Sequence, residues 1–385
     1  MPPDPRKPNA AEQDIPWAEL EQIVHRDPAG RGLASFRQHG TALDAGQLRA
    51  AAVHLAQHAT AVGIVTGFCI ADGPRVAAET DGPPGALFLA RAFSALGIES
   101  ILISDGFALP LLEAGCDAWN LAGVGLVEFP LEPGAPDSPA RACNNIDESV
   151  ATEPWLDAFF STGLCRSLSH LIAIERPSPN HTLDSLAEQK RLGLAPAERF
   201  VALVPAADRD ICHNMRGQSI NAYTAKTHRL FERIAAERLP IATIGIGDGG
   251  NEIGMGSFAW ETIVDALGGD VAGNFAGRIA ARIATDFTLI GGVSNWAAYA
   301  LALSLARLRD AENLARDWDE RAERGLIEAL VSAGAVDGVT RLQEPTVDGL
   351  ELDAYLAPLT AMRSLLGLDD NTERRTLPPS APLGL

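Results

Sequence analysis

A glycine-rich segment, Gly245–Gly256, holds the densest group of residues that could do chemistry. Its sequence is GIGDGGNEIGMG and follows an apolar run, so its six glycines allow the backbone to wrap closely around a small anion or a metal. Asp248, Asn251 and Glu252 add hard oxygen ligands of the kind that Mg²⁺ and Mn²⁺ prefer. The alternative is a tight strand–helix turn in which Asp248 acts as a cap.

Two familiar phosphate-binding motifs are excluded in this segment. A dinucleotide-binding GxGxxG motif needs a third glycine where Glu252 stands, and a P-loop needs Lys and then Ser or Thr where Met255 stands. The chain also lacks a GxSxG nucleophile elbow, and no cysteine lies in a recognisable activating motif. A covalent serine or cysteine hydrolase is therefore not expected.

A second acidic pair, Glu79 and Asp81, lies in the segment ETDGPPGA, just after the first predicted strand and its loop. In an extended segment these two side chains point to the same side, and Pro84 suits the first turn of a following helix. Together with the glycine-rich segment, this pair would complete a metal site shared between loops. Alternatively, Asp81 or Gly82 only caps the helix.

Two further polar groups could transfer a proton or bind a carboxylate. Glu175 ends an apolar run before Arg176 and a proline that terminates the strand, so it is either a base or half of a structural ion pair. In the segment NMRG, Arg216 could hold a carboxylate in a bidentate fork, with Asn214 beside it. A solvated surface arginine is the alternative there.

Ser294 and Asn295 follow two glycines in the segment GGVSNW, where a predicted strand ends and a helix opens. Ser294 is a natural N-cap, whereas Asn295 and the glycines leave room for a ligand at the helix N-terminus. His54 and His58 stand four residues apart on another predicted helix, but the Glu of an HExxH zinc motif is missing. We expect a solvated helix face at these histidines.

Short apolar runs alternate with helical patterns through the middle of the chain. The predicted strands are Ala61–Ala71, Ser100–Asp105, Gly123–Pro130, His170–Glu175, Ile241–Asp248 and Phe287–Val293, and the predicted helices are Ala45–His58, Pro84–Leu96, Glu148–Cys165, Ile220–Arg238 and Asn295–Asp310. This alternation predicts a doubly wound, mostly parallel Rossmann-like α/β sheet with helices on both faces and extra terminal helices. Ligands of such sheets bind beyond the carboxyl ends of the strands.

The composition restricts the partners of the chain. Its 385 residues include 31 basic and 50 acidic side chains, and the formal charge of −19 argues against nucleic-acid binding and against anionic membrane surfaces. Five cysteines without a CxxC pair suit a reducing compartment. No segment is long and apolar enough to span a membrane, and the first residues do not resemble a signal peptide. We expect a cytoplasmic protein.

Pro-rich polar ends flank one predicted domain. We expect a mobile tail over residues 1–16, a single α/β domain over residues 17–368 and a second mobile tail over residues 369–385. No internal repeat or long linker divides the domain. The sequence leaves open whether the chain forms a homo-oligomer.

The same motifs, taken together, resemble one protein family. They are ETDGPPGA (Glu79–Ala86), AIERP (Ala173–Pro177), NMRG (Asn214–Gly217), TIGIGDGGNEIGMG (Thr243–Gly256), GGVSNW (Gly291–Trp296) and PTVDGLELDAYLAPL (Pro345–Leu359). In this order they are similar to the C-terminal domain of the mitochondrial D-glutamate cyclases, which also occurs as stand-alone prokaryotic chains. The resemblance extends from about Phe68 to Leu366.

The resemblance implies an enzyme, a carbon–oxygen lyase that converts D-glutamate to 5-oxo-D-proline and water. For this reaction we expect catalytic residues Glu252, Asp248 and Glu175, metal ligands Glu79, Asp81, Asp248 and Glu252, and substrate-binding residues Arg216, Asn214, Asn251, Ser294 and Asn295. The expected partner is a small anionic amino acid, and a chain of charge −19 would repel it unless a local metal cation, such as Mg²⁺ or Mn²⁺, or an arginine offsets the charge. The alternatives are a metal-dependent hydrolase of a small anionic metabolite, acting on a phosphate or an amide, and a non-catalytic metabolite-binding module.

Overall fold

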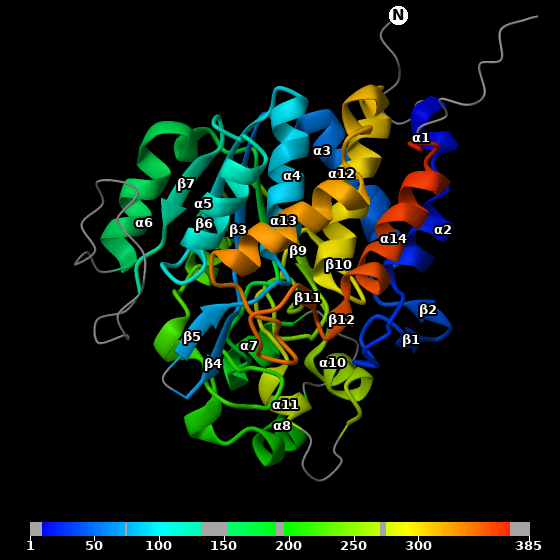
Figure 1. Ribbon diagram of the computed structural model, residues 1–385. Helices are drawn as coiled ribbons and strands as arrows, with labels where there is room; N and C mark the ends of the chain where they lie inside the picture. The colour runs from blue at the N-terminus through cyan, green and yellow to red at the C-terminus, as the bar shows by residue number, and fades with distance from the viewer. Residues whose placement is uncertain (1–9, 74, 132–151, 190–195, 270–274, 370–385) are drawn as a thin grey trace, which may run out of the picture.

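The computed structural model describes residues 10–73, 75–131, 152–189, 196–269 and 275–369. Within them, one sheet contains six parallel strands in the spatial order β10-β9-β8-β3-β6-β7 (Figure 1). These strands are β3 (Ala61–Thr66), β6 (Glu99–Ser104), β7 (Gly125–Glu128), β8 (His170–Ile174), β9 (Ala242–Gly247) and β10 (Phe287–Ile290). The chain order reverses between β3 and β8, as in doubly wound sheets. The predicted fold class is confirmed.

Alternate side chains of the strands enter hydrophobic layers on opposite faces of the sheet, because successive residues of a strand point in opposite directions. In β8, Ile172 and Ile174 join the cluster on one face, while Leu171 and Ala173 join the cluster on the other. Strand β3 is buried along its whole length. This is the burial expected of a parallel strand covered by helices on both sides.

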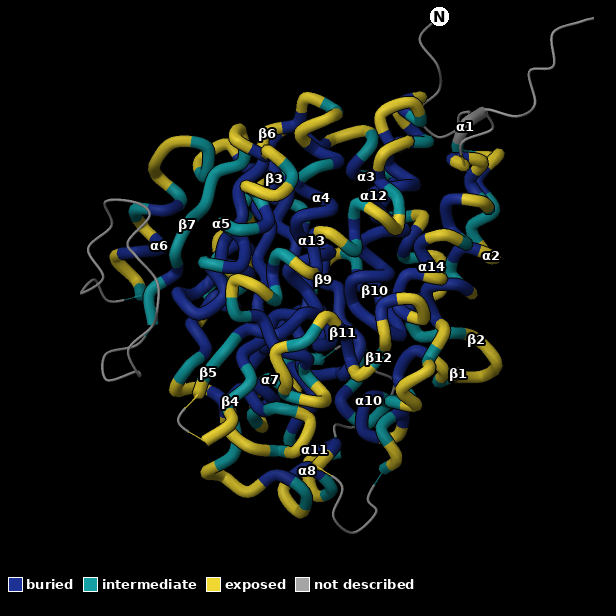
Figure 2. Tube along the Cα trace, viewed as in Figure 1, coloured by how far each residue is buried: buried dark blue, intermediate teal, exposed yellow. Residues whose placement is uncertain are grey.

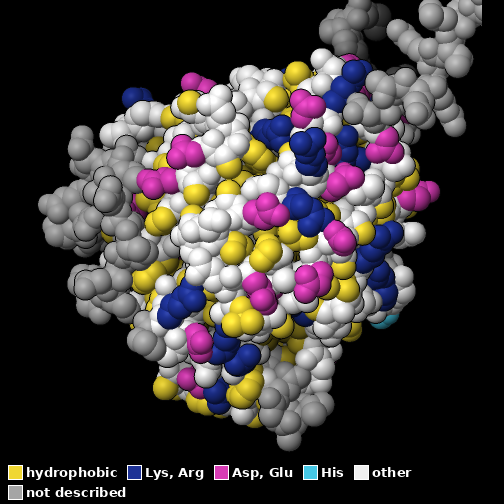
Figure 3. All heavy atoms as spheres, in the orientation of Figure 1, with side chains coloured by type: hydrophobic (Ala, Val, Ile, Leu, Met, Phe, Trp, Pro, Cys, Tyr) yellow, Lys and Arg dark blue, Asp and Glu magenta, His cyan; other side chains and the backbone are white. Residues whose placement is uncertain are grey.

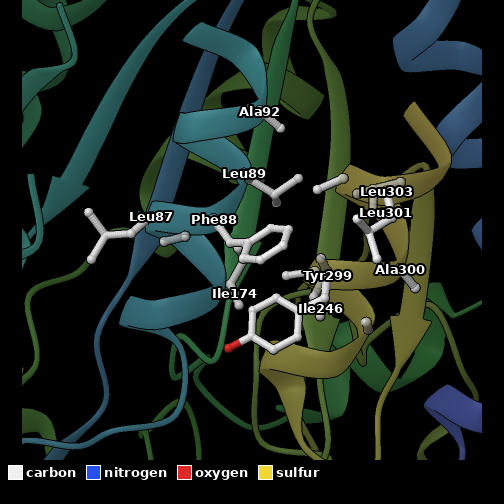
Figure 4. Close-up of a cluster of buried hydrophobic side chains, with 14 of the residues drawn as sticks. Leu87, Phe88, Leu89, Ala92, Ile174, Ile246, Tyr299, Ala300, Leu301 and Leu303 are labelled. Atoms are coloured by element: carbon white, nitrogen blue, oxygen red, sulfur yellow. The ribbon is translucent and has the colours of Figure 1, made fainter. Parts of the chain in front are cut away.

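Helices α4 and α12 lie together over one face of the sheet, with other helices around them (Figures 1 and 2). The helices of this layer are α2 (Trp17–Val24), α3 (Gln47–His58), α4 (Pro83–Ala95), α5 (Leu109–Ala118), α12 (Ser294–Leu308), α13 (Glu320–Ser332) and α14 (Leu352–Leu365). Figure 4 shows Phe88 of α4 beside Tyr299 of α12, and their ring centroids are 4.6 Å apart. Helix α12 is buried on almost every side, so it is a core element rather than an amphipathic surface helix.

Helices α6 (Thr152–Ser161) and α9 (His228–Glu237) pack against the hydrophobic cluster of the opposite face. The sequence pattern predicted longer helices over Glu148–Cys165 and Ile220–Arg238. Residues 148–151 of the first lie outside the described residues. The second begins only at α9, because the residues before it form a short 3₁₀ turn and an extended connection.

Small elements gather beyond the carboxyl ends of the strands, in the lower part of Figure 1. They are the hairpins β1–β2 (Arg37–Gln38, Thr41–Ala42), β4–β5 (Cys69–Asp72, Arg75–Ala78) and β11–β12 (Thr346–Val347, Leu350–Glu351), and the helices α7 (Leu183–Glu188), α8 (Ala197–Leu203), α10 (Trp260–Ala266) and α11 (Ala276–Ile279). The predicted strand Ala61–Ala71 is divided here, because Gly67 turns the chain with a φ of 105°. A Cβ at Gly67 would lie 2.6 Å from the Cβ of Ala108, so only glycine fits this turn.

The predicted tails lie mostly outside the described residues, which exclude residues 1–9 and 370–385; Ala10–Asp14 form the short helix α1. The remaining short elements are the 3₁₀ helices Gly163–Ser167, Ala206–Asp208, Asn221–Tyr223 and Glu312–Ala315. Among the described helices, none has both the length and the apolar character needed to cross a membrane. On the face shown in Figure 3, acidic and basic side chains are interspersed, so the negative charge does not form one continuous patch there.

Candidate functional site

Five acidic side chains predicted from the sequence lie after β8, after β9 and after the hairpin β4–β5 that follows β3. They are Glu79, Asp81, Glu175, Asp248 and Glu252, and none is more than 6% exposed. The chain order of the sheet reverses between β3 and β8, and the crevice at that point is the usual ligand site of doubly wound sheets. The fold therefore gathers these acids where a ligand is expected.

Asp81, Glu175 and Asp248 form a buried triad. Each offers one carboxylate oxygen, and these oxygens all lie within 4.8 Å of one another. Within the part of the chain that the structure describes, the Oδ1 atom of Asp248 has no hydrogen-bond partner. Carboxylate oxygens are the ligands that Mg²⁺ and Mn²⁺ prefer, so the triad could bind a metal ion.

Glu175 enters the triad because the chain turns sharply at the end of β8. Its φ is 43°, a left-handed conformation that is uncommon for any residue except glycine. Arg176 extends away from the triad to Asp105, whose Oδ2 lies 2.7 Å from its Nη1. Glu175 Oε2 instead accepts a hydrogen bond from Ser294 Oγ at 2.5 Å. The structural ion pair considered for this segment thus involves Arg176, and Glu175 lines the pocket described below.

Asp81 and Asn295 cap the two helices beside the triad. Asp81, in the loop before α4, accepts hydrogen bonds from the N–H groups of Ser294 and Asn295 at the start of α12. Asn295 Oδ1 in turn accepts hydrogen bonds from the N–H groups of Gly82 and Gly85 at the start of α4. Asp81, which precedes α4, therefore caps the start of α12, and Asn295, which lies in α12, caps the start of α4. The proposed contact of Asn295 with substrate stays a prediction.

Glu252 shapes the glycine-rich loop. Its Oε1 accepts a hydrogen bond from the Gly249 N–H at 2.7 Å, and its Oε2 accepts one from the Gly250 N–H at 2.8 Å. A Cβ at Gly247 would lie 2.6 Å from Oε2, so the loop can close around this carboxylate only because that residue is glycine. The catalytic and metal-binding roles of Glu252 stay predictions.

Arg31 is a cation among these acids that no sequence motif marks. Its Nη1 lies 2.5 Å from Asp248 Oδ2, and its Nη2 lies 2.5 Å from Oδ1 of Asp348, an acid in the turn between β11 and β12. Asp27 holds this segment by accepting hydrogen bonds from the N–H groups of Arg31 and Gly32. An aspartate followed by glycines and an arginine is ordinary in solvated turns, so the spacing alone could not have assigned Arg31 to the site.

These groups open into one pocket, the acid pocket, with a volume of about 230 Å³. The predicted site residues that line it are Glu79, Glu175, Asn214, Arg216, Asp248, Asn251 and Glu252. Arg31 and Arg341 add further positive charge to its walls. Asp81, Ser294 and Asn295 are buried. Asp81 shares the triad with the lining residue Glu175, Ser294 donates a hydrogen bond to Glu175, and the N–H group of Asn295 donates to Asp81.

Two comparisons with known proteins show the family of this chain. The sequence model of the family described as D-glutamate cyclase-like, C-terminal, matches residues 20–189 and 200–363. The chain belongs to this family. It is also 32% identical over 295 residues to the mitochondrial D-glutamate cyclase of Homo sapiens. That match covers 74% of this chain and only 38% of the human protein.

Burial raises the pKa values of the five acids at this site of the D-glutamate cyclase-like chain. It raises the pKa of Asp81 to about 8, and repulsion from Asp348 adds to the effect. Burial also raises the pKa of Glu175 well above its usual value, with further repulsion from Asp248. Arg31 does not neutralise all of these carboxyl groups, so the cluster must hold protons or bind a further cation.

Proposed function

We propose that this chain is a D-glutamate cyclase-like lyase that converts D-glutamate to 5-oxo-D-proline and water with the assistance of Mg²⁺ or Mn²⁺. The observation that carries the proposal is the buried triad of Asp81, Glu175 and Asp248, which could bind a metal ion beside a small pocket. Membership in the D-glutamate cyclase-like family supports the choice of reaction. So does the name of the human relative.

The acid pocket offers both signs of charge that a dicarboxylic amino acid requires. Arg216 provides a guanidinium fork for the α-carboxylate, and the buried acids favour the ammonium group. The pocket volume of about 230 Å³ favours a substrate as small as glutamate, because pockets for drug-sized ligands occupy roughly 300–1,000 Å³.

The reaction needs no second substrate, because the amine attacks the γ-carboxyl carbon of the same molecule. A C–N bond forms and a C–O bond breaks, and two of the three ammonium protons end on the departing oxygen, which leaves as water. The pocket must therefore select the folded conformer of glutamate and move protons from nitrogen to oxygen.

Residues of the acid pocket suit these tasks. A divalent cation held by Asp81, Glu175 and Asp248 would supply positive charge that polarises the γ-carboxyl group. Glu79 lines the pocket outside the triad, and burial, together with repulsion from Asp348, raises its pKa well above the usual value. We assign Glu79 the transfer of a proton from the ammonium group to the departing oxygen.

The test is an assay of the purified, metal-stripped full chain with D-glutamate or L-glutamate, each with and without Mn²⁺ or Mg²⁺. Chiral chromatography should detect 5-oxo-D-proline only with D-glutamate and metal. The variant Asp248→Asn should lose activity by about 100-fold or more, because it removes the carboxylate with the free oxygen. Asp117→Asn, on an exposed part of α5, is the matched control and should keep full activity.

Other outcomes would overturn the proposal. Full activity of Asp248→Asn would exclude the triad from the reaction. Thermal stabilisation by D-glutamate without any product would favour the metabolite-binding module. Release of phosphate or an amine from a panel of small anionic substrates, with no 5-oxoproline from glutamate, would favour the hydrolase.

A further inference from the structure

The rim of the acid pocket carries more apolar and cationic side chains than D-glutamate needs. Met215 is 39% exposed and Val339 is 51% exposed, so they lie at the opening of the pocket, whereas its acids are buried. We define the rim as the exposed or half-buried lining residues Ile70, Ala71, Met215, Arg216, Val339 and Arg341. The proposed reaction uses only Arg216 of this set, so the other side chains require an explanation.

The apolar part of the rim comes from three segments of the chain. Ile70 and Ala71 belong to β4, Met215 lies in the turn between the paired residues His213 and Ser219, and Val339 precedes β11. Single exposed apolar side chains are ordinary, but apolar groups that gather at one pocket are typical of a ligand site. Glutamate offers them only two methylene groups. The rim therefore suits a ligand that carries a further apolar group.

Arg341 is a second cation of the rim, and its partner holds it weakly. Its Nη1 lies 3.6 Å from Oδ1 of Asp72, which is beyond hydrogen-bond distance, and the Asp72 side chain is 66% exposed. Such an exposed pair contributes little. Arg31, by contrast, pairs closely with two buried carboxylates. Because Arg216 already serves the α-carboxylate in the proposed function, Arg341 is available for a second carboxylate.

A buried acid fixes the turn that presents Val339 and Arg341. Asp337 is fully buried, and its Oδ1 accepts hydrogen bonds from the N–H groups of Val339 and Thr340, both at 2.8 Å. Its Oδ2 accepts one from the Gly349 N–H at 2.7 Å. The N–H group of Arg341 donates to the Asp337 carbonyl oxygen at 2.8 Å. A turn held in this way loses little entropy when its side chains bind a ligand.

We propose that the acid pocket also accepts γ-D-glutamyl amides of apolar amino acids, such as γ-D-glutamyl-L-leucine. The glutamyl part occupies the place of D-glutamate, the apolar side chain lies against Met215 and Val339, and Arg341 binds the second carboxylate. Since the rim is exposed, the leaving amino acid extends toward solvent and does not have to fit within the volume of about 230 Å³. This inference rests on the proposed function, because the amine attacks the same γ-carbon.

The reaction of such an amide balances without a further reactant. The amine attacks the γ-amide carbon, so that a new C–N bond closes the ring and the C–N bond of the amide breaks. The electron pair of the breaking bond stays on the leaving nitrogen. Two of the three ammonium protons pass to this nitrogen, which departs as the ammonium group of a free amino acid. The other product is 5-oxo-D-proline, as with D-glutamate.

The first test compares four substrates of the full chain with Mn²⁺: γ-D-glutamyl-L-leucine, γ-D-glutamylglycine, D-glutamine and D-glutamate. Chiral chromatography would measure 5-oxo-D-proline after subtraction of the spontaneous reaction. The kcat/KM for the leucine dipeptide should exceed that for D-glutamine at least tenfold, with the glycine dipeptide between them. D-glutamine has neither the apolar group nor the second carboxylate, so it is the reference.

Variants of the rim assign this preference to its residues. Arg341→Gln should lower the ratio of the leucine dipeptide to D-glutamine at least fivefold, and Val339→Asn should lower the ratio of the leucine to the glycine dipeptide at least threefold. The matched controls are Arg321→Gln, at an exposed position of α13, and Val201→Asn, on α8, where the valine is also 51% exposed. Both controls should keep the ratios of the wild type.

The second test measures binding by calorimetry and does not need turnover. Glutaryl-L-leucine and glutaramic acid both lack the attacking amine, so neither can cyclise. The wild type should bind glutaryl-L-leucine at least tenfold more tightly, and Arg341→Gln should reduce this difference at least fivefold. Equal affinity of the wild type for the two compounds would overturn the inference.

The substrate series separates this inference from the proposed function. Turnover of D-glutamate, with the leucine dipeptide no better than D-glutamine, would overturn the inference and leave the proposed function intact. Product from the leucine dipeptide but none from D-glutamate would overturn the proposed function and support the inference. No 5-oxo-D-proline from any of the four substrates would overturn both.

Discussion

Glu175 and Arg176 are neighbours in the chain, but they belong to two buried groups of charged side chains. The two groups differ in how well their positive and negative charges are paired. Arg176 is fully buried and pairs with Asp105. Its guanidinium also donates hydrogen bonds to Thr227 Oγ1 and to the carbonyl oxygens of Gly67 and Ala225. In this group, the positive charge faces a carboxylate and its donors have partners.

The group around Glu175 is not balanced in this way. It brings Glu175 close to Asp81 and Asp248, and Arg31 faces only part of this negative charge. One oxygen of Asp248 also finds no hydrogen-bond partner among the described residues. The difference between these groups is instructive, because a buried charge is tolerated only when it is paired and hydrogen-bonded. The paired charges stabilise the fold, and the unbalanced ones mark the place where a ligand or a proton is needed.

The largest expected effect on stability follows from removing Arg176 from its ion pair with Asp105. Arg176→Met should lower the free energy of unfolding by about 3–5 kcal/mol, because it leaves the carboxylate of Asp105 buried without its partner. Urea denaturation would measure this loss. The matched control is Arg324→Met, which removes an arginine from an exposed pair with Asp353 and should cost far less. Equal losses in both variants would contradict the distinction drawn between the two groups.

A smaller effect is expected at Glu323, a buried acid that lies outside the acid pocket. Tyr299 donates a hydrogen bond to it, and burial raises its pKa to about 8. The folded chain therefore keeps a proton that the unfolded chain releases near its ordinary pKa, about 4.5. The stability that this proton contributes is complete below that value and is lost as the pH rises toward 8.

The variant Glu323→Gln should remove this pH dependence. Its free energy of unfolding should gain about 3 kcal/mol relative to the wild type between pH 5 and pH 8 and then stay level. Denaturation curves at a series of pH values would show the change. Glu328→Gln, at an exposed position of the same helix, should give no such trend. A constant difference across this pH range would show that Glu323 is ionised in the folded chain.

The smallest effect is expected at Ser294, whose hydroxyl donates to Glu175. Ser294→Ala should weaken Mn²⁺ binding and lower kcat about 5- to 20-fold, since one hydrogen bond to a charged group contributes about 1–2 kcal/mol. Ser304→Ala is the matched control, because Ser304 is buried in the same helix and its Oγ has no hydrogen-bond partner in the described ranges of the chain. Metal titration by calorimetry tests the first effect even without turnover. Equal metal affinity in the two variants would exclude Ser294 from the site.

The sequence predicted where the acids lie because strand ends are local features. Asp81, Glu175 and Asp248 each follow an apolar run at a short distance, and parallel strands bring their carboxyl ends to one edge. The hairpin after β3 was not predicted, since the apolar run continues through Gly67 to Ala71 without a polar interruption. Its turn depends on the close approach of Ala108, which no local pattern reveals.

The balance of charge in the site could not be predicted from the sequence. Arg31 is 217 residues from Asp248 along the chain, and Asp348 lies in a turn near the other end of the domain. Their meeting depends on how the terminal segments pack. The hydrogen bonds of Glu252 differ from these contacts, because they join residues only two or three positions apart in the chain. However, the surrounding sequence does not distinguish a carboxylate that accepts hydrogen bonds from its own loop from one that binds a ligand.

The reciprocal caps of Asp81 and Asn295 also set the order in which a nascent chain can build the site. Asp81 and the N–H group of Ser294 that it caps are 213 residues apart. At a synthesis rate of roughly 5–20 residues per second, the ribosome reaches Ser294 roughly 10–40 s after Asp81. Until then the start of α4 lacks its amide cap and Asp81 stays hydrated. A ribosome stalled before α12 would therefore hold a chain that already contains Asp81, Glu175 and Asp248 but lacks the N–H groups of α12 that Asp81 caps, so the site is completed only late in synthesis.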